Sequence, residues 1–341
     1  MSQIADFRSD TVTRPTPAMR QAMLEAEVGD DVLGEDPSVN RLEARAAEVA
    51  GKEAALFVPS GTMGNQIAIR AHTNPGEEII CEERSHIVLY EMGMAASFSG
   101  CLFRTVSTES GLLGWGDIAP RLRAASDHFH GTGLIEIENT ANMAGGRVYP
   151  LDQIREIADK AHAAGVRVHM DGARVFNAAT ASGVDVSEVV GPVDSVMFCL
   201  SKGLGAPVGS LLAGTTDLIA KARDIRKGLG GGMRQAGVIA AAGMIALEES
   251  PAGLDQAHAD ARFLAESLEA IEGIELDQPT VDSNIVFFKT KREGETVATL
   301  RQRLRAQGIL VSGSGDRIRM LTHHDVTRHD CERAISAIRA F

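Results

Sequence analysis

The sequence is poor in aromatic residues and in cysteine, and it contains no long apolar run. Aromatic side chains make up 4% of the 341 residues, and the four cysteines are far apart with no CxxC spacing. This arrangement argues against a disulfide framework and against a zinc site, and we expect core thiols. No apolar run approaches membrane-spanning length, and the first residues lack a basic region followed by an apolar one. The sequence therefore predicts a cytoplasmic protein.

Positive charge is also scarce. Lysine and arginine number 34 against 46 aspartates and glutamates, which gives a formal net charge of -12 and disfavours binding to nucleic acid or an anionic membrane. With 44% hydrophobic residues and 35 glycines, the composition is that of an α/β enzyme with a substantial core and many tight turns. Apart from His86, the histidines show no metal-ligand spacing, and we predict no catalytic metal.

Strand-like and helical segments alternate through the first two thirds of the chain. Several strand-like runs are apolar on both faces, as buried parallel strands require, and helical spacing of apolar residues appears between them, as in 151–161. The alternation predicts a mostly parallel sheet covered by helices on both sides. The expected strands are 54–58, 78–81, 101–106, 133–137, 166–170, 195–200 and 210–213.

A change of pattern near residue 249 predicts a domain boundary. The alanine-rich segment 235–249 is expected to form a helix that ends before a proline. We assign residues 1–248, with an N-terminal arm, to a large domain and residues 249–341 to a small α+β domain. The small domain is predicted to contain helices 295–307 and 327–340 and strands 284–288, 309–311 and 317–321.

Lys202 is the most informative single residue. It follows the strand-like run 195–200 and precedes a glycine-rich turn. A lysine at the end of a buried strand is costly unless its charge is paired or lost. A desolvated amine can instead form a Schiff base with an aldehyde cofactor such as pyridoxal phosphate. The alternative is a surface lysine on a loop, which is the commoner place for this residue.

A turn between a strand and a helix carries Ser60, Gly61 and Thr62. Free N–H groups, hydroxyls and the helix dipole at such a turn favour a phosphate. An ordinary helix cap by Ser60 or Thr62 explains the same residues. The chain has neither the phosphate-loop nor the dinucleotide-turn glycine pattern, so the turn by itself indicates only that a phosphate can bind.

Asp171 follows the run 166–170, at the sheet edge where ligands bind in open α/β proteins. A carboxylate there can keep a pyridine nitrogen protonated, and Arg174 can serve a phenolate oxygen or a substrate carboxylate. The alternative is a structural Asp-Arg pair or a helix cap. His86 either stacks on a flat cofactor or caps a helix, and Arg319 either binds a carboxylate or lies on the surface.

Together these groups follow the chain order expected of pyridoxal phosphate enzymes of the aspartate-aminotransferase fold type: a phosphate turn, a histidine, a strand-end aspartate, then Ser201-Lys202. The chain resembles the low-specificity L-threonine aldolases, which belong with the β-eliminating lyases of that fold type, over nearly its whole length. The segments that carry the resemblance are 7–16, 29–37, 59–65, 169–174, 200–209, 230–235 and 319–323.

The resemblance implies an aspartate-aminotransferase-like fold and pyridoxal 5'-phosphate as the cofactor. It implies that Lys202 forms the internal aldimine, that His86 stacks on the pyridine ring and that Asp171 pairs with the ring nitrogen. Implied contacts of the cofactor also include Ser60, Gly61, Thr62, Arg174, Ser201 and Arg234. Implied contacts of the substrate carboxylate are Ser9, Arg174 and Arg319.

Family members are commonly homotetramers with active sites at dimer interfaces, so Arg234 and the Leu33 loop are expected to reach a neighbour's site. Two positions depart from the commonest family pattern. Leu33 stands where the family often has a tyrosine, and Ala141 stands where it often has a histidine that faces the substrate hydroxyl. The second departure bears on threo or erythro preference and on the identity of the base.

The sequence therefore predicts an enzyme of threonine catabolism and glycine metabolism that cleaves L-threonine, L-allo-threonine and related β-hydroxy-α-amino acids to glycine and an aldehyde. His86 or a nearby water is expected to take the hydroxyl proton. Alternatives are β-elimination on the same scaffold and cleavage of a bulkier substrate such as phenylserine, which Ala141 favours. A nicotinamide-dependent dehydrogenase is poorly supported, because this sequence lacks the glycine fingerprint of such enzymes. A noncatalytic scaffold would leave Lys202, Asp171 and Arg174 unexplained.

Overall fold

A seven-stranded sheet organises the larger part of the computed structural model, which describes residues 4–340. The strand order is β2-β8-β7-β6-β5-β3-β4, and β8 runs antiparallel to both of its neighbours while the other pairs are parallel. This confirms the predicted mostly parallel sheet. The strands are β2 (Ala54–Val58), β3 (Glu78–Glu82), β4 (Leu102–Val106), β5 (Thr132–Glu138), β6 (Arg167–Asp171), β7 (Ser195–Cys199) and β8 (Ser210–Gly214).

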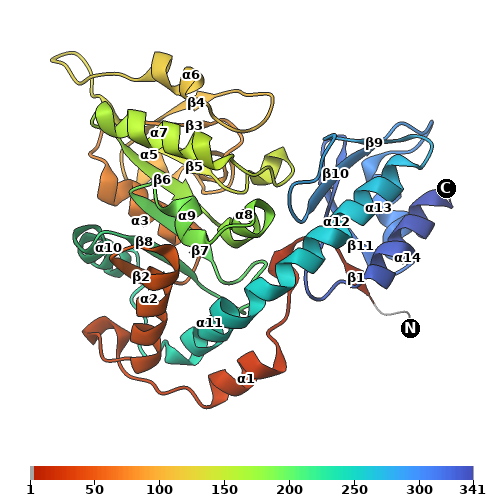
Figure 1. Cartoon of the computed structure of the whole chain (residues 1–341), viewed down its shortest axis with the longest axis horizontal. Coiled ribbons are helices and arrows are strands. Elements are labelled where there is room, and N and C mark those ends of the chain that lie inside the picture. The colour runs from red at the N-terminus through yellow and green to blue at the C-terminus, as the bar shows by residue number, and fades with distance from the viewer. Residues whose placement is uncertain (1–3, 341) are drawn as a thin grey trace.

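Helices cover both faces of this sheet because its inner strands are apolar on both sides (Figure 1). Along β7, Met197 packs into the core next to α3 and α10, whereas Val196 and Phe198 belong to the core next to α2, α7 and α11. The helices of this part are α2 (Pro37–Ala50), α3 (Gly61–His72), α4 (His86–Leu89), α5 (Met94–Ser97), α6 (Trp115–Ile118), α7 (Leu151–Ala163), α8 (Val175–Ser182), α9 (Val186–Val190), α10 (Thr216–Gly228) and α11 (Gly237–Glu249).

A smaller antiparallel sheet with the order β12-β13-β10-β9 forms the C-terminal sheet domain. The predicted α+β character is confirmed, but β9 and β12 were not predicted because β9 has three residues and β12 has no apolar side chain. The elements are α12 (Leu254–Glu269), β9 (Ile274–Leu276), β10 (Ile285–Thr290), α13 (Val297–Ala306), β12 (Ser312–Ser314), β13 (Arg317–Leu321) and α14 (Arg328–Arg339).

The N-terminal arm joins the two parts of the chain (Figure 1). Strand β1 (Ala5–Asp6) pairs in parallel with β11 (Ile309–Leu310), and Phe7 is buried in the core of the C-terminal sheet domain. The expected strand near residue 309 therefore exists, but it pairs with the arm and not with the smaller sheet. The arm then continues to α1 (Pro17–Leu24), which packs on α11. The proposed division of the chain at residue 248 stays a prediction.

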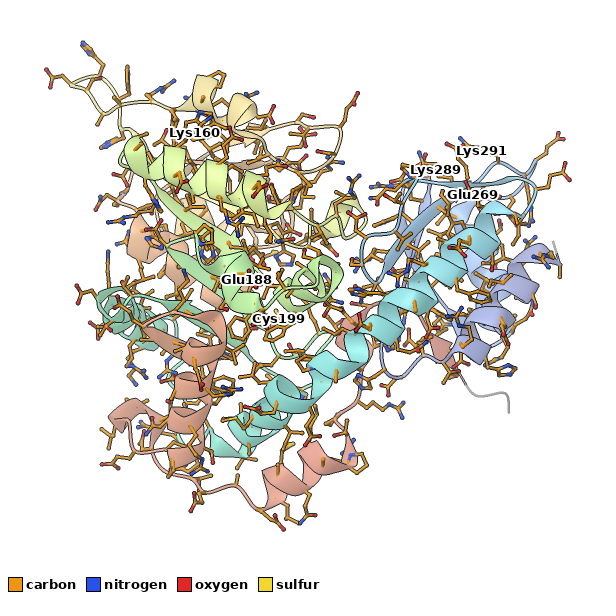
Figure 2. All side chains as sticks on the ribbon, in the orientation of Figure 1. Lys160, Glu188, Cys199, Glu269, Lys289 and Lys291 are labelled. Atoms are coloured by element: carbon orange, nitrogen blue, oxygen red, sulfur yellow. The ribbon has the colours of Figure 1, made fainter. Side chains whose placement is uncertain are left out.

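The buried side chains agree with the composition. All four cysteines are free and buried, which confirms core thiols. Figure 2 shows Cys199 in the interior, with Lys160 and Lys291 on the outside. Within residues 4–340, none of the helices combines the length and apolar character needed to cross a membrane.

Arg226 makes a buried ion pair that we expect to contribute strongly to stability. Its guanidinium is 2% exposed, lies 2.9 Å from Asp31 and donates to the carbonyl oxygen of Phe57. Arg226→Met should lower the free energy of unfolding by about 3 kcal/mol, because Asp31 is left buried without its partner. Urea denaturation measures this loss. Arg41→Met removes an exposed pair and should cost less than about 1 kcal/mol; equal losses in the two variants would contradict the prediction.

Candidate active site

The site lies at the carboxyl ends of β5, β6 and β7, and α3 begins at the same edge of the sheet. Lys202 follows β7 in a turn that closes through a hydrogen bond from the Gly205 N–H to the Lys202 carbonyl oxygen. The turn needs a glycine at 205 because its φ is +78°. The ammonium group interacts electrostatically with Asp10 of the arm and with His86 of α4. Of these two groups, His86 was associated with Lys202 in the sequence analysis and Asp10 was not.

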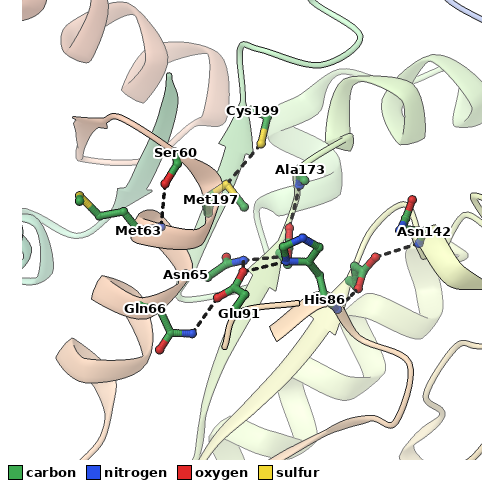
Figure 3. Close-up of polar contacts among 12 residues, drawn as sticks. Ser60, Met63, Asn65, Gln66, His86, Glu91, Asn142, Ala173, Met197 and Cys199 are labelled. Carbon is green, nitrogen blue, oxygen red and sulfur yellow. Dashed lines mark hydrogen bonds and ion pairs between the residues drawn. The ribbon is translucent and has the colours of Figure 1, made fainter. Parts of the chain in front are cut away.

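Asp171 is the last residue of β6 and is almost fully buried. Its Oδ2 accepts a hydrogen bond from Nδ2 of Asn65 at 2.7 Å, and its Oδ1 accepts one from the Ala173 N–H at 3.0 Å. Asn65 comes from α3, so this helix supports the carboxylate from the side (Figure 3). Two donors from different segments therefore fix the orientation of this carboxylate.

His86 begins α4 and is held at both ends. Its backbone N–H donates to Glu138 at 2.7 Å, and its Nδ1 lies 2.9 Å from Oε1 of Glu91 (Figure 3). Burial lowers the pKa of His86, but the hydrogen bond to Glu91 and the charge of Asp171 outweigh burial and raise it. Because a carboxylate only accepts, the neutral ring carries its proton on Nδ1 and presents Nε2 as an acceptor.

The N-terminus of α3 is accessible at the turn that precedes it. Ser60 caps the helix through its Oγ, which accepts from the Met63 N–H at 3.2 Å, while Gly61 and Thr62 are only partly buried. A Cβ on Gly61 would lie about 3.0 to 3.3 Å from side-chain atoms of Met197 and Cys199, so a glycine is needed for this close approach to β7. Ser60 takes the Met63 N–H, so within the described residues the N–H groups of Gly61 and Thr62 are the ones this turn offers to an anion.

Two guanidinium groups meet beside a single carboxylate. Arg174 donates from Nε and Nη2 to the two oxygens of Asp10, each at 2.7 Å, and both residues are buried. Burial raises the pKa of Asp10, but Arg174 outweighs it and holds the pKa well below its usual range. Burial, together with the charge of Arg174, lowers the pKa of Arg319 to about 10, and its buried Nε has no hydrogen-bond partner among residues 4–340. The group carries an excess of positive charge and can accept another carboxylate.

Other predicted residues lie near this centre or on the surface beside it. Ser9 precedes Asp10 on the arm, and its Oγ accepts from the Thr11 N–H at 3.2 Å. Ser201 is partly exposed in the turn next to Lys202. Leu33 is 68% exposed, and the Arg234 side chain is 65% exposed and paired with Asp30 at 2.9 Å.

Ala141 is buried after β5 and lies beside Glu138, with a void of about 10 Å³ that both residues line. Glu138 accepts hydrogen bonds from the backbone N–H groups of His86 and Asn142. Burial and the charge of Asp171 raise the pKa of Glu138 to about 7. The void has about the volume that one water molecule needs.

Several residues of the site were not predicted from the sequence, among them Asp10, Asn65, Glu91 and Glu138. Asp10 lies within the segment 7–16 that carries the resemblance, which is the signal that could have identified it. Asn65 lies in the segment 59–65, which carries the resemblance as well. Glu91 and Glu138 are polar residues whose burial becomes visible only in the folded chain.

Ligand atoms of His86, Glu91 and Asp171 lie within 4.8 Å of one another, as do those of Glu136, Glu138 and Asp171. In the first group the Asn65 amide donates to both carboxylates, and His86 donates to Glu91. The absence of a catalytic metal stays a prediction.

Sequence comparison identifies a protein family and relatives that agree with the resemblance found above. The family model for "Beta-eliminating lyase" matches residues 6–291. The chain is 44% identical over 340 residues to low-specificity L-threonine aldolase 1 of Arabidopsis thaliana, which covers 98% of this chain and 95% of the relative. It is 40% identical over 337 residues to the low specificity L-threonine aldolase of Escherichia coli (strain K12), which covers 98% of each.

Solved structures share the fold. A threonine aldolase of Leishmania major superposes with a TM-score of 0.83 at 21% identity, covering 98% of this chain and 99% of that one. A structure of SPT with its PLP internal aldimine superposes with a TM-score of 0.77 at 20% identity, covering 99% of this chain and 86% of that one. These likenesses confirm the predicted fold type, with its parallel sheet and C-terminal sheet domain.

Proposed function

The chain belongs to the β-eliminating lyase family, and on that basis we propose that it is a pyridoxal phosphate-dependent aldolase. Its substrates are L-threonine, L-allo-threonine and related β-hydroxy-α-amino acids, which it cleaves to glycine and an aldehyde. One observation carries the proposal: Lys202, Asp171 and the Arg174–Arg319 pair converge at one edge of the sheet. Relatives of 40 to 45% identity over nearly the whole chain bear the name low-specificity L-threonine aldolase.

The residues at this edge fit pyridoxal phosphate. Lys202 supplies an amine, Asp171 supplies a buried carboxylate for a protonated pyridine nitrogen, and the open first turn of α3 supplies N–H groups for a phosphate. When bound, this cofactor withdraws electrons from the α-carbon of an amino acid and so weakens its bonds. We propose that His86 fixes the ring plane by stacking, because Glu91 and Glu138 hold it from both ends.

Substrate orientation depends on the arginines. The α-carboxylate binds Arg319, whose Nε has no partner among residues 4–340, and Arg174. Three of the five N–H donors of Arg174 are taken by Asp10 and Asn142, which leaves one on each terminal nitrogen. Holding the carboxylate decides which bond at the α-carbon is cleaved. The hydroxyl proton passes to Nε2 of His86 or to a water near Ala141, where the void could hold it.

A product assay tests this function. Purified protein with added pyridoxal phosphate should release aldehyde and glycine in equal amounts from L-threonine and L-allo-threonine, with the D-isomers as controls. Faster cleavage of L-phenylserine would favour the alternative of a bulkier substrate, for which Ala141 leaves room. Pyruvate and ammonia in place of glycine and aldehyde would contradict the aldolase and support a β-eliminating lyase.

We further propose a homotetramer in the cytoplasm, acting in threonine catabolism and glycine metabolism. Support for a subunit interface comes from the large exposed apolar side chains of Leu24, Leu33 and Val238. The segment of Arg234 also lies close to the first turn of α3, since a Cβ on Gly231 would meet Met63. We propose that Arg234 and the Leu33 loop reach a neighbour's phosphate site in this assembly. Light scattering of the purified protein tests the subunit number.

A further inference from the structure

A chain of hydrogen bonds runs through the interior from His72 at the end of α3 to Asp171. His72 Nε2 lies 2.8 Å from Ser195 Oγ, and Ser195 Oγ lies 2.8 Å from His169 Nδ1. His169 Nε2 lies 3.1 Å from Asn65 Oδ1, and Asn65 Nδ2 donates to Asp171 at 2.7 Å. Ser195, His169 and Asn65 are completely buried. The function proposed above uses none of the members beyond Asn65.

The direction of this chain is fixed at its Asp171 end. The Asn65 amide donates to Asp171 and also to Oε1 of Glu91 at 2.9 Å (Figure 3). Both carboxylates accept only, so Nδ2 must face them and Oδ1 must face His169. His169 then carries its proton on Nε2 and donates it to Asn65.

The remaining links follow from the state of His169. Burial lowers its pKa to about 3, and burial lowers the pKa of His72 to about 4, so both rings are neutral near pH 7. With its proton on Nε2, His169 has a bare Nδ1 that accepts from the Ser195 hydroxyl. Ser195 Oγ in turn accepts from His72 Nε2. Every link therefore points toward Asp171.

We propose that His72, Ser195 and His169 are positioning residues that keep the Asn65 amide turned toward Asp171, and that they thereby hold the Asp171 carboxylate in place as the partner of the cofactor's ring nitrogen. The inference rests on the proposed function, because it concerns the cofactor of that reaction. If Ser195 loses its hydroxyl, no donor keeps Nδ1 of His169 bare, and the ring can move its proton to Nδ1, where the Ser195 backbone is an acceptor. Its bare Nε2 would then face Asn65 Oδ1, two acceptors would oppose each other, and the amide would turn away from Asp171.

Two spectroscopic measurements on the enzyme with its bound cofactor test this chain of hydrogen bonds. In ¹⁵N NMR of histidine-labelled wild type, His169 should show the Nε2–H tautomer, and Ser195→Ala should shift it toward the Nδ1–H tautomer. With ¹⁵N-labelled pyridoxal phosphate, the ring nitrogen signal should move toward its unprotonated position in Ser195→Ala. Outer hydrogen-bond partners of metal ligands are worth about 10- to 100-fold in activity, and by the same reasoning we expect Ser195→Ala to lower kcat about 10-fold with little change in KM.

Variants of His72 provide the matched comparison, since this residue is only partly buried. His72→Gln keeps an N–H donor and should retain the wild-type signals. His72→Leu removes the donor to Ser195 Oγ, which frees this hydroxyl to accept from His169 Nδ1, and it should shift both signals in the same direction as Ser195→Ala. Thr73→Val is the control at the same end of α3. It removes a buried hydroxyl that donates to the Ile69 carbonyl oxygen and takes no part in the chain of hydrogen bonds, so the ring nitrogen signal should stay unchanged.

Wild-type positions of both signals in Ser195→Ala and His72→Leu would overturn the inference. If Ser195→Ala does not fold, the test is the comparison of the NMR signals of His72→Leu with those of His72→Gln. Failure of the proposed function looks different: the wild type itself would release no aldehyde from threonine, whatever the state of His169.

Discussion

Replacing Lys202 by alanine is expected to abolish the absorbance of the protein-linked cofactor and to lower aldehyde release from L-threonine by at least about 1000-fold. The turn after β7 presents this amine toward Asp10 and His86. Alanine removes the group that would bind the cofactor aldehyde and can carry a proton, and proton transfer by a positioned side chain alone is worth about 100- to 10,000-fold. The measurements are a visible spectrum of the purified protein and a coupled aldehyde assay.

Two further variants are informative: one keeps the positive charge at position 202 without a reactive amine, and the other is a control at an exposed lysine. Lys202→Arg keeps a positive charge beside Asp10 but has no amine that forms a Schiff base, and it should be as inactive as Lys202→Ala. Lys160→Ala removes an exposed lysine that pairs with Glu156, and it should retain full activity. Threonine cleavage by Lys202→Ala at the wild-type rate would rule out the assigned role.

The parts of the site that the sequence could predict are those at the ends of apolar runs. The runs before Asp171 and Lys202 mark buried strands, and strands that run parallel end at the same edge of a sheet. Ser60 could be located because a strand and a helix meet at a turn of small residues. For these positions, local pattern and topology together bring the residues into one site.

Other parts depend on contacts between distant segments. Asp10 reaches Arg174 only because β1 pairs with β11 and Phe7 enters the core of the C-terminal sheet domain. Strands as short as β1 and β11, with two residues each, produce no detectable alternation. The links of Asn65 to Asp171 and His169 likewise join residues of α3 and β6 that are about a hundred positions apart, as no local pattern can show.

Arg317 and Arg319 illustrate the same limit within one strand. Both arginines belong to β13, and the resemblance singled out Arg319, but their strand pattern alone does not tell which one is free to bind a ligand. In the fold, Arg317 pairs with Asp277 at 2.8 Å and lies over the Phe287 ring. Nε of Arg319 is buried next to Arg174 and has no partner among residues 4–340. Packing thus makes Arg317 a structural residue and leaves Arg319 for a ligand.

This difference predicts opposite effects of Arg319→Met on stability and on substrate binding. Arg319 is partly buried, and its buried Nε has no hydrogen-bond partner among residues 4–340. Removing this guanidinium from beside Arg174 should raise the free energy of unfolding of the ligand-free protein by about 1 to 2 kcal/mol. The same change removes a partner of the substrate carboxylate, a loss of about 2 to 5 kcal/mol, and should raise KM for L-threonine at least about 30-fold. Urea denaturation and steady-state kinetics measure the two effects.

Arg317→Met is the matched control two residues earlier on β13. It removes an ion pair and a cation–π contact, so it should lower stability by up to about 1 kcal/mol and leave KM unchanged. Glycine, which carries the same α-carboxylate, should raise the melting temperature of the wild type and of Arg317→Met but not that of Arg319→Met. An Arg319→Met protein that is less stable and keeps the wild-type KM would mean that Arg319 supports the fold and does not bind the substrate.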